Sequence, residues 1–182
     1  DANEQGIEPY NKFVNEQAAL NPSLTGTDDG LRYSVVGSAV GVNAVNNATV
    51  WGPVYLFDST FVAQNHADFW DGSIANPINI DQFGNSVEPT LVFTGSNTIG
   101  TKPRGQISHY GLGSYSVTAS GYTGATNRDW ISKTFSDPIK PLPMYALSPW
   151  LIAGQGAVPE PSAALLLLGC SVLLLRRKRE NQ

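Results

Sequence analysis

The sequence predicts an α+β protein in which short strands and long polar loops surround a small sheet. Three observations predict this class. Residues 10–20 carry a weak apolar face at helical spacing. Short runs rich in β-branched and aromatic residues, such as 54–58 and 90–96, are typical of strands. Clusters of Gly, Pro, Asn and Asp separate these runs and indicate loops, as in residues 21–30.

The middle of the chain alternates between predicted strands and turns. Residues 31–42 are expected to form a strand with a bend at Gly37, and residues 43–53 a connection. A single helical turn is expected at 66–70. Turns are expected where Gly, Pro, Asn and Asp combine, at Asp71-Gly72, Asn76-Pro77 and 83–85.

The last third of the body holds two further predicted strands, at residues 115–124 and 142–152. Between them, residues 129–138 place their apolar side chains at helix-like or loop spacing. Residues 153–157 form a glycine-rich linker. Trp51 and two further tryptophans are expected to be core residues, because tryptophan contributes large apolar area; the other two are Trp70 and Trp130.

Composition limits the possible partners. Of the 182 residues, 41% are hydrophobic and only 14% are charged, against roughly 25% charged in an average soluble protein. Up to Ala157 the chain holds 7 basic and 13 acidic residues, hence a net charge of −6. Such an acidic body is a poor ligand for phosphate backbones, so nucleic acid is not expected as a partner.

Cysteine and the start of the chain carry less information. The single cysteine, Cys170, lies in an apolar run near the end, so the body cannot contain a disulfide. A domain of about 150 residues can fold without one. The chain begins at Asp1 and shows no basic region followed by an apolar one, and we expect that its natural start lies further upstream.

The end of the chain carries the strongest signal. Ala163–Leu175 is an apolar run of 13 residues, which as a helix would span roughly 20 Å of a hydrocarbon core roughly 30 Å thick. Length alone fits a buried core helix, which stays open as the alternative. However, the leucines cover every face of such a helix, which predicts a membrane helix at about 162–175 that contacts lipid. Four bases follow at once and should remain cytoplasmic: Arg176, Arg177, Lys178 and Arg179.

A proline motif precedes this run. Val158, Pro159, Glu160 and Pro161 disfavour helix before them, and Pro161 can open one. The whole unit, Val158–Arg179, resembles the PEP-CTERM sorting signal of bacteria. The resemblance implies that an exosortase, a membrane protease, recognises these four residues and cuts at or near them. The body would then reach the cell surface or its exopolysaccharide matrix.

The body itself resembles another family. Its fragments match, in order, motifs of extracellular C-type-lectin-like modules close to the endostatin-like branch. These modules have a small twisted sheet with long loops. The matching fragments are Gly52–Thr60, Ala67–Asn85, Val92–Gly100, Arg128–Ile131 and Met144–Ser148.

This second resemblance implies a domain layout, and the sequence differs from the family pattern in two respects. An ectodomain would occupy residues 1–152, the linker 153–157 and the sorting signal 158–182. Where family members often carry a cysteine pair, this chain has Glu4 and Asn127. The usual first strand would precede the chain, so we expect the chain ends to lack their usual pairing and the stability to be lowered.

Candidate metal residues are sparse. His66 lies near Asp68 and Asp71, but this spacing is not typical of a metal site, and a surface histidine with turn-forming aspartates is the simpler interpretation. Lectin calcium sites use an E-P-N loop and a W-N-D strand. Glu88-Pro89-Thr90 matches the first only in part, and Arg128-Asp129-Trp130 reverses the second. We expect no metal and no cofactor.

No motif indicates catalysis either. Neither Ser108-His109 nor Asp71-Gly72-Ser73 stands in a nucleophile elbow, and residues 94–100 lack the Lys-Ser/Thr of a phosphate loop. The sequence therefore predicts a non-enzymatic exported surface or extracellular-matrix protein, with no catalytic residues. It would span the membrane once, with a cytoplasmic C-terminus, until processed. The alternative is a carbohydrate-binding module that grips the exopolysaccharide.

Overall fold

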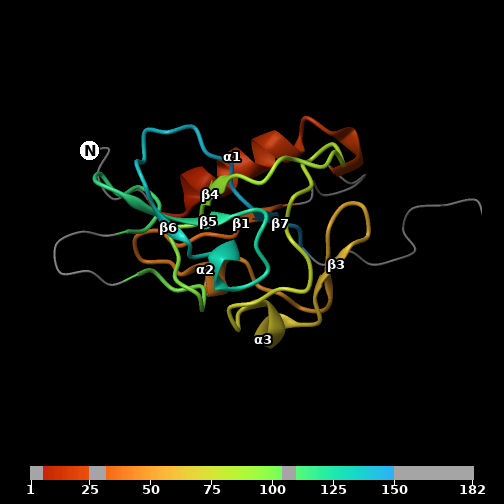
Figure 1. Ribbon diagram of the computed structural model, residues 1–182. Helices are drawn as coiled ribbons and strands as arrows, with labels where there is room; N and C mark the ends of the chain where they lie inside the picture. Colours follow the sequence, from red (N-terminus) through yellow and green to blue (C-terminus); the bar gives the residue numbers. More distant parts are fainter. Residues whose placement is uncertain (1–5, 25–31, 104–109, 150–182) are drawn as a thin grey trace, which may run out of the picture. The chain divides into compact units, whose positions relative to one another are not determined.

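The fold mixes short helices with small antiparallel sheets (Figure 1). The computed structural model describes residues 6–24, 32–103 and 110–149. Within these residues no helix has the length and the apolar character needed to cross a membrane. The predicted helix at 162–175, the motif Val158–Pro161 and the bases Arg176–Arg179 lie outside the described residues.

The first element is helix α1, Glu8–Ala18. It confirms the helix predicted at 10–20, although it begins two residues earlier. Pro9 explains the early start, because a proline in the first turn loses no intrahelical hydrogen bond. Val14 and Ala18 are buried, and a 3-10 helix, η1 (Pro22–Leu24), follows in the predicted loop.

The first and last strands pair with each other. β1 (Ser34–Val35) runs antiparallel to β7 (Ala146–Leu147). The late strand therefore has a partner within the described chain, whereas the expected first strand upstream of Asp1 stays a prediction. Val36 N still bonds Tyr145 O, next to β7, at 3.0 Å, but Ser38 N bonds Thr94 O at 2.8 Å, so the chain changes neighbour between these two residues. This change of neighbour shortens the strand predicted at 31–42.

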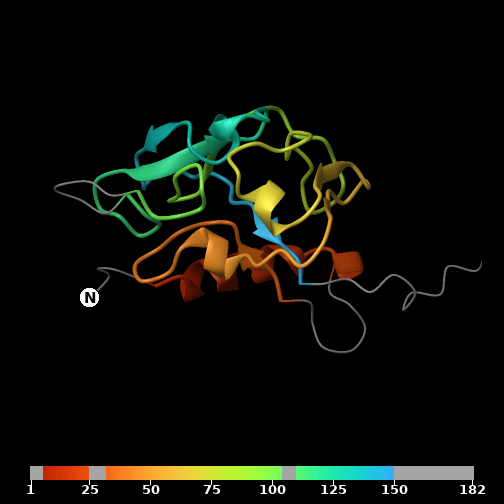
Figure 2. The same ribbon diagram turned by 90° about the horizontal axis from the view of Figure 1, so that it is seen from below.

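A three-stranded sheet, in the order β4-β5-β6, lies beyond this pair. Its strands are β4 (Leu91–Phe93), β5 (Thr118–Tyr122) and β6 (Thr134–Ser136). A parallel bridge between Phe93 and Met144 joins β4 to the segment that leads into β7. That segment thus lies between β1 and β4, and Figure 2 shows α1 on one side of the β1–β7 pair and the three-stranded sheet on the other.

The remaining elements are short. β2 (Val54–Tyr55) and β3 (Phe61–Ala63) form an antiparallel hairpin. α3 (His66–Phe69) confirms the predicted helical turn, and its N-cap, Asn65, accepts a hydrogen bond from Asp68 N. α2 (Ala44–Asn47) and η2 (Arg128–Trp130) complete the list.

The larger core cluster is built around aromatic rings. Trp130 is fully buried, and its ring centroid lies 6.3 Å from that of Trp70 and 5.9 Å from that of Tyr145. Both indole N–H groups are buried without a hydrogen-bond partner among the described residues. Trp70 and Trp130 are confirmed as core residues. Trp51 is 72% exposed, so its prediction as a core residue is wrong.

Candidate functional site

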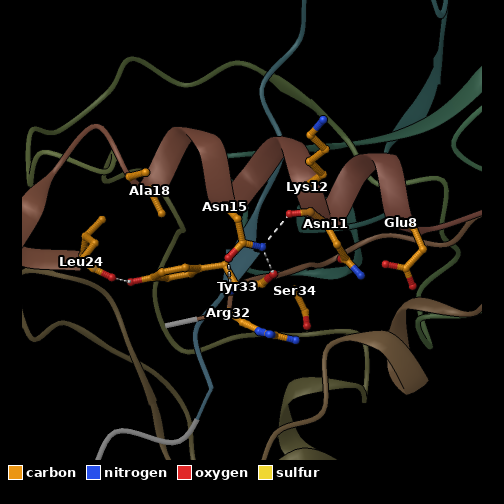
Figure 3. Close-up of a pocket in the computed structure, with 10 residues that line it drawn as sticks. Glu8, Asn11, Lys12, Asn15, Ala18, Leu24, Arg32, Tyr33 and Ser34 are labelled. Carbon is orange, nitrogen blue, oxygen red and sulfur yellow. Dashed lines mark hydrogen bonds between the residues drawn. The ribbon is translucent and has the colours of Figure 1, made fainter. Parts of the chain in front are cut away.

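A groove of about 610 Å³ runs along α1 (Figure 3). The helix forms one wall, and the segment that leads into β1 forms the other. The groove is open to solvent along its length. Its lining residues are Glu8, Asn11, Lys12, Asn15, Ala18, Ala19, Leu24, Arg32, Tyr33 and Ser34.

Asparagine side chains of α1 hold the two walls together. Asn15 Oδ1 accepts from Tyr33 N at 2.8 Å, and Asn15 Nδ2 donates to Tyr33 O at 2.7 Å. One turn earlier, Asn11 Oδ1 accepts from Val35 N at 2.9 Å. Residues 11 and 15 share a helix face, and residues 33 and 35 point the same way along a strand, so the two spacings match.

A third amide completes this contact. Asn47 of α2 donates from Nδ2 to Val35 O at 2.8 Å and to Asn11 Oδ1 at 2.9 Å. The edge of β1 that faces away from β7 is thereby covered by side-chain amides instead of a strand. These amides stabilise the wall of the groove, and their hydrogen-bonding groups are used within the protein.

The charged groups of the groove have few partners. Lys12 makes a weak exposed pair with Glu16, at 3.7 Å, and points away from the floor in Figure 3. Glu8 and Arg32 form no ion pair among the described residues. Burial raises the pKa of the Tyr33 phenol, whose hydroxyl donates to Leu24 O at 3.3 Å. The side chains that line the groove are mostly amides and charged groups, which are able to bind a polar ligand.

The predicted metal candidates are held in local turns. Asp68 Oδ2 accepts from Gln64 N at 2.6 Å, and Asp71 Oδ1 accepts from Ser73 N at 2.8 Å. The His66 ring lies 6.5 Å from that of Trp70. Across the described ranges, no three His, Cys, Asp or Glu side chains gather closely enough to hold a metal ion.

Two further aspartates stabilise turns on the surface. The Thr60 backbone N–H lowers the pKa of Asp58, to which it donates at 2.9 Å. The Asn85 backbone N–H does the same for Asp81, also at 2.9 Å. Asp58 is exposed and Asp81 is half-buried, and the lowered pKa of each keeps both carboxylates ionised at neutral pH.

The lectin-like triplet forms η2 and is not arranged as a site. Trp130 is buried, and Asn127 caps the helix by accepting from Asp129 N at 3.0 Å. Asn127 therefore has a local structural role as the cap of η2. Glu4 and the pair Ser108-His109 lie outside the described residues.

Sequence reasoning missed an exposed aromatic surface. Trp51, Tyr55 and Phe57 are 72%, 57% and 51% exposed, and Pro53 between them is exposed too. We call these four residues the aromatic face. The sequence contains a sign of this surface, because ring-bearing side chains stand at every second position from Trp51 to Phe57. Side chains two residues apart in a strand point to the same side.

Comparison with protein-family models, with curated proteins and with solved structures gave no match for this chain. Its class is therefore defined by the structure alone, as a mixed helix-and-strand protein with small sheets.

Proposed function

We propose that this chain is a non-enzymatic exported protein of the bacterial cell surface or extracellular matrix. Its last residues act as a sorting signal that an exosortase-type membrane protease processes. Before processing, the protein spans the membrane once through residues 162–175, with its C-terminus in the cytoplasm. After processing, the body stays at the surface or in the matrix.

One observation carries the proposal, namely the order of three features at the end of the chain. The motif Val158–Pro161 comes first, the apolar run Ala163–Leu175 second, and the bases Arg176–Arg179 last. A basic end beside a short apolar helix orients it with the bases in the cytoplasm. The acidic, weakly charged body is consistent with an extracellular position.

The intact mass of the mature protein tests the proposal. The full chain, behind an export signal, is expressed in bacteria that carry an exosortase. We expect a C-terminus trimmed close to Pro159-Glu160-Pro161. Replacing Glu160 with Gln should leave the tail uncut, whereas the neighbouring control Ser162→Ala should be trimmed normally. An untrimmed wild-type chain would contradict the sorting function.

We also propose that the body has a C-type-lectin-like topology. The pairing of β1 with β7 supports this, because it joins the earliest described strand to the latest one. The short strands and the long connections between them are consistent with the proposal. An experimental structure of the body in which these two strands do not pair would refute it.

The second candidate function is carbohydrate binding. The aromatic face favours it, because exposed aromatic rings mark interaction surfaces. A glycan array probed with the full chain, with and without a chelator, tests this candidate. Specific retention on any glycan supports it, and its absence across the array leaves only the sorting function.

A further inference from the structure

The aromatic face projects from one side of an extended segment. Exposure alternates from Trp51 to Phe57, with Trp51, Tyr55 and Phe57 directed to solvent. Val54 and Leu56, between them, pack against the larger core cluster. The packing of Val54 and Leu56 against the core fixes which side of the segment faces solvent, and it holds the backbone that carries the exposed rings in place.

Neighbouring segments extend this surface. Tyr55 pairs in register with Phe61 of β3, and their ring centroids lie 5.7 Å apart in an edge-on arrangement. Gly84 lies against the Phe57 ring, since a β-carbon there would stand 3.2 Å from Phe57 Cδ1. The turn that contains Gly84 therefore lies beside Phe57, and it carries Phe83, which is 52% exposed.

The charge around the aromatic face excludes anionic ligands. Neither 51–63 nor 79–87 contains a lysine or an arginine. The only side chains in these two segments that carry a charge at neutral pH are Asp58 and Asp81. The exposed Asp58 carboxylate accepts from Thr60 N at 2.9 Å. A carboxylate has about four lone-pair sites, so it can also accept hydrogen bonds from hydroxyl groups of a ligand.

The size of the surface argues against a second copy of this chain as its occupant. The three aromatic side chains of the aromatic face expose roughly 400 Å² in total, from the usual area of each ring system. A stable interface needs about 800 Å² on each partner.

We propose that the aromatic face binds a neutral polysaccharide without a metal ion, by stacking successive sugar rings on Trp51, Tyr55 and Phe57. The C–H groups on one face of a sugar ring are weakly positive and pack against the negative face of an aromatic ring. The exposed Asp58 carboxylate accepts hydrogen bonds from sugar hydroxyls. This assignment rests on the second candidate function and locates its site.

A proline-rich peptide is the competing ligand. Such peptides dock in aromatic-lined grooves, whereas the groove of about 610 Å³ lies along α1 and no residue of the aromatic face lines it. Proline-rich backbones also lack donors for Asp58. The observations therefore favour the polysaccharide.

Affinity electrophoresis of the full chain in mild detergent tests the proposal. The gels contain hydroxyethyl cellulose, a soluble β-1,3-glucan or galactomannan. We expect retardation by at least one of them, unchanged by EDTA. Trp51→Ala and Tyr55→Ala should each weaken binding about tenfold, whereas Trp51→Phe should keep most of it. Tyr115→Ala, which removes a 64% exposed aromatic elsewhere, serves as the matched control.

Each outcome decides the matter. If the Trp51→Ala and Tyr55→Ala variants are still retarded by the polysaccharide, the aromatic face is not the binding site, although carbohydrate binding itself is supported. No retention on any of the three polysaccharides, loss of retention in EDTA, or binding of a polyproline peptide in their place overturns the proposal. Concentration-dependent dimerisation abolished by Trp51→Ala would assign the face to a second copy. Thermal unfolding of each variant confirms that the fold is kept, and failure of any arm leaves the tail-processing result unaffected.

Discussion

The side chain of Asn15 and the backbone of Tyr33 exchange two hydrogen bonds, at 2.7 and 2.8 Å. A primary amide carries a donor and an acceptor in the same relative arrangement as a peptide group. Asn15 therefore satisfies Tyr33 as a neighbouring strand would. Through this contact α1 covers the outer edge of β1, an edge that would otherwise invite pairing with another chain.

We expect Asn15→Ala to lower the free energy of unfolding by about 1–2 kcal/mol. The substitution leaves two part-buried backbone groups of Tyr33 unpaired, and the better helix propensity of alanine offsets only part of that cost. Chemical denaturation measures the change. Asn46→Ala is the control, since Asn46 is exposed and its side chain makes no hydrogen bond within the described residues. Equal stabilities for the two variants would contradict the role of the amide.

Gly121→Ala should destabilise the protein by about 3 kcal/mol. Gly121 pairs with Val92 inside the three-stranded sheet, and η2 packs directly on it. A β-carbon there would collide with the carbonyl oxygen of Trp130 and lie 2.9 Å from Ile131 Cα. Backbone atoms cannot move aside as side chains can, so the strand or η2 must shift.

The control for this substitution is Gly6→Ala, where an added β-carbon would meet nothing within 4 Å. We expect its melting temperature to stay close to that of the wild type. If Gly121→Ala melted within a degree of Gly6→Ala, the close packing of η2 on β5 would be refuted.

Stability should fall at alkaline pH because of Tyr145. Burial raises the pKa of its phenol above the ordinary value of 10.0, and its hydroxyl donates to Trp130 O at 3.2 Å. Above pH 10 the unfolded chain releases this proton while the folded chain keeps it. The contribution is therefore complete below pH 10 and is lost as the pH rises through the folded pKa.

Denaturation curves between pH 8 and 11 measure this effect. The free energy of unfolding of Tyr145→Phe should fall less steeply with pH over that range. Part of the pH dependence should remain, because burial also raises the pKa values of Tyr10 and Tyr33. Identical slopes for the wild type and Tyr145→Phe would show that Tyr145 does not titrate differently on unfolding.

Residues 158–182 fused to a soluble reporter should carry it to the membrane fraction. The apolar run buries its leucines in lipid, and the bases that follow stay at the cytoplasmic surface. Carbonate washing followed by immunoblotting measures the partition. A matched fusion with Leu165–Leu168 changed to asparagine should remain in the aqueous fraction, and a wild-type fusion found there would refute membrane insertion.

Local patterns predicted several elements well. The helix near residues 10–20 and the turn at 66–70 were found because apolar spacing and capping residues act over a few neighbours. The strands at β4 and β5 were found from runs of β-formers. These signals do not depend on distant parts of the chain.

Elements without a local pattern were missed. The segment of β6 was expected to be helical or loop. In the structure Thr134 and Phe135 are both exposed on this edge strand, so its sequence lacks the alternation of polar and apolar residues that marks a half-buried strand. β3 lay in a stretch given no element. The exposure of Trp51 was missed because residue type predicts burial only on average.

By itself, the sequence determined the α+β class, the position of α1, the acidic character of the body and the ordered motif at its end. These follow from composition and from spacing along the chain. Only the tertiary structure decided that β1 pairs with β7, that Asn11 and Asn15 cover the edge of β1, and that the aromatic face is left open. Such contacts join residues far apart in sequence, and which side chains they bury depends on every segment packed around them.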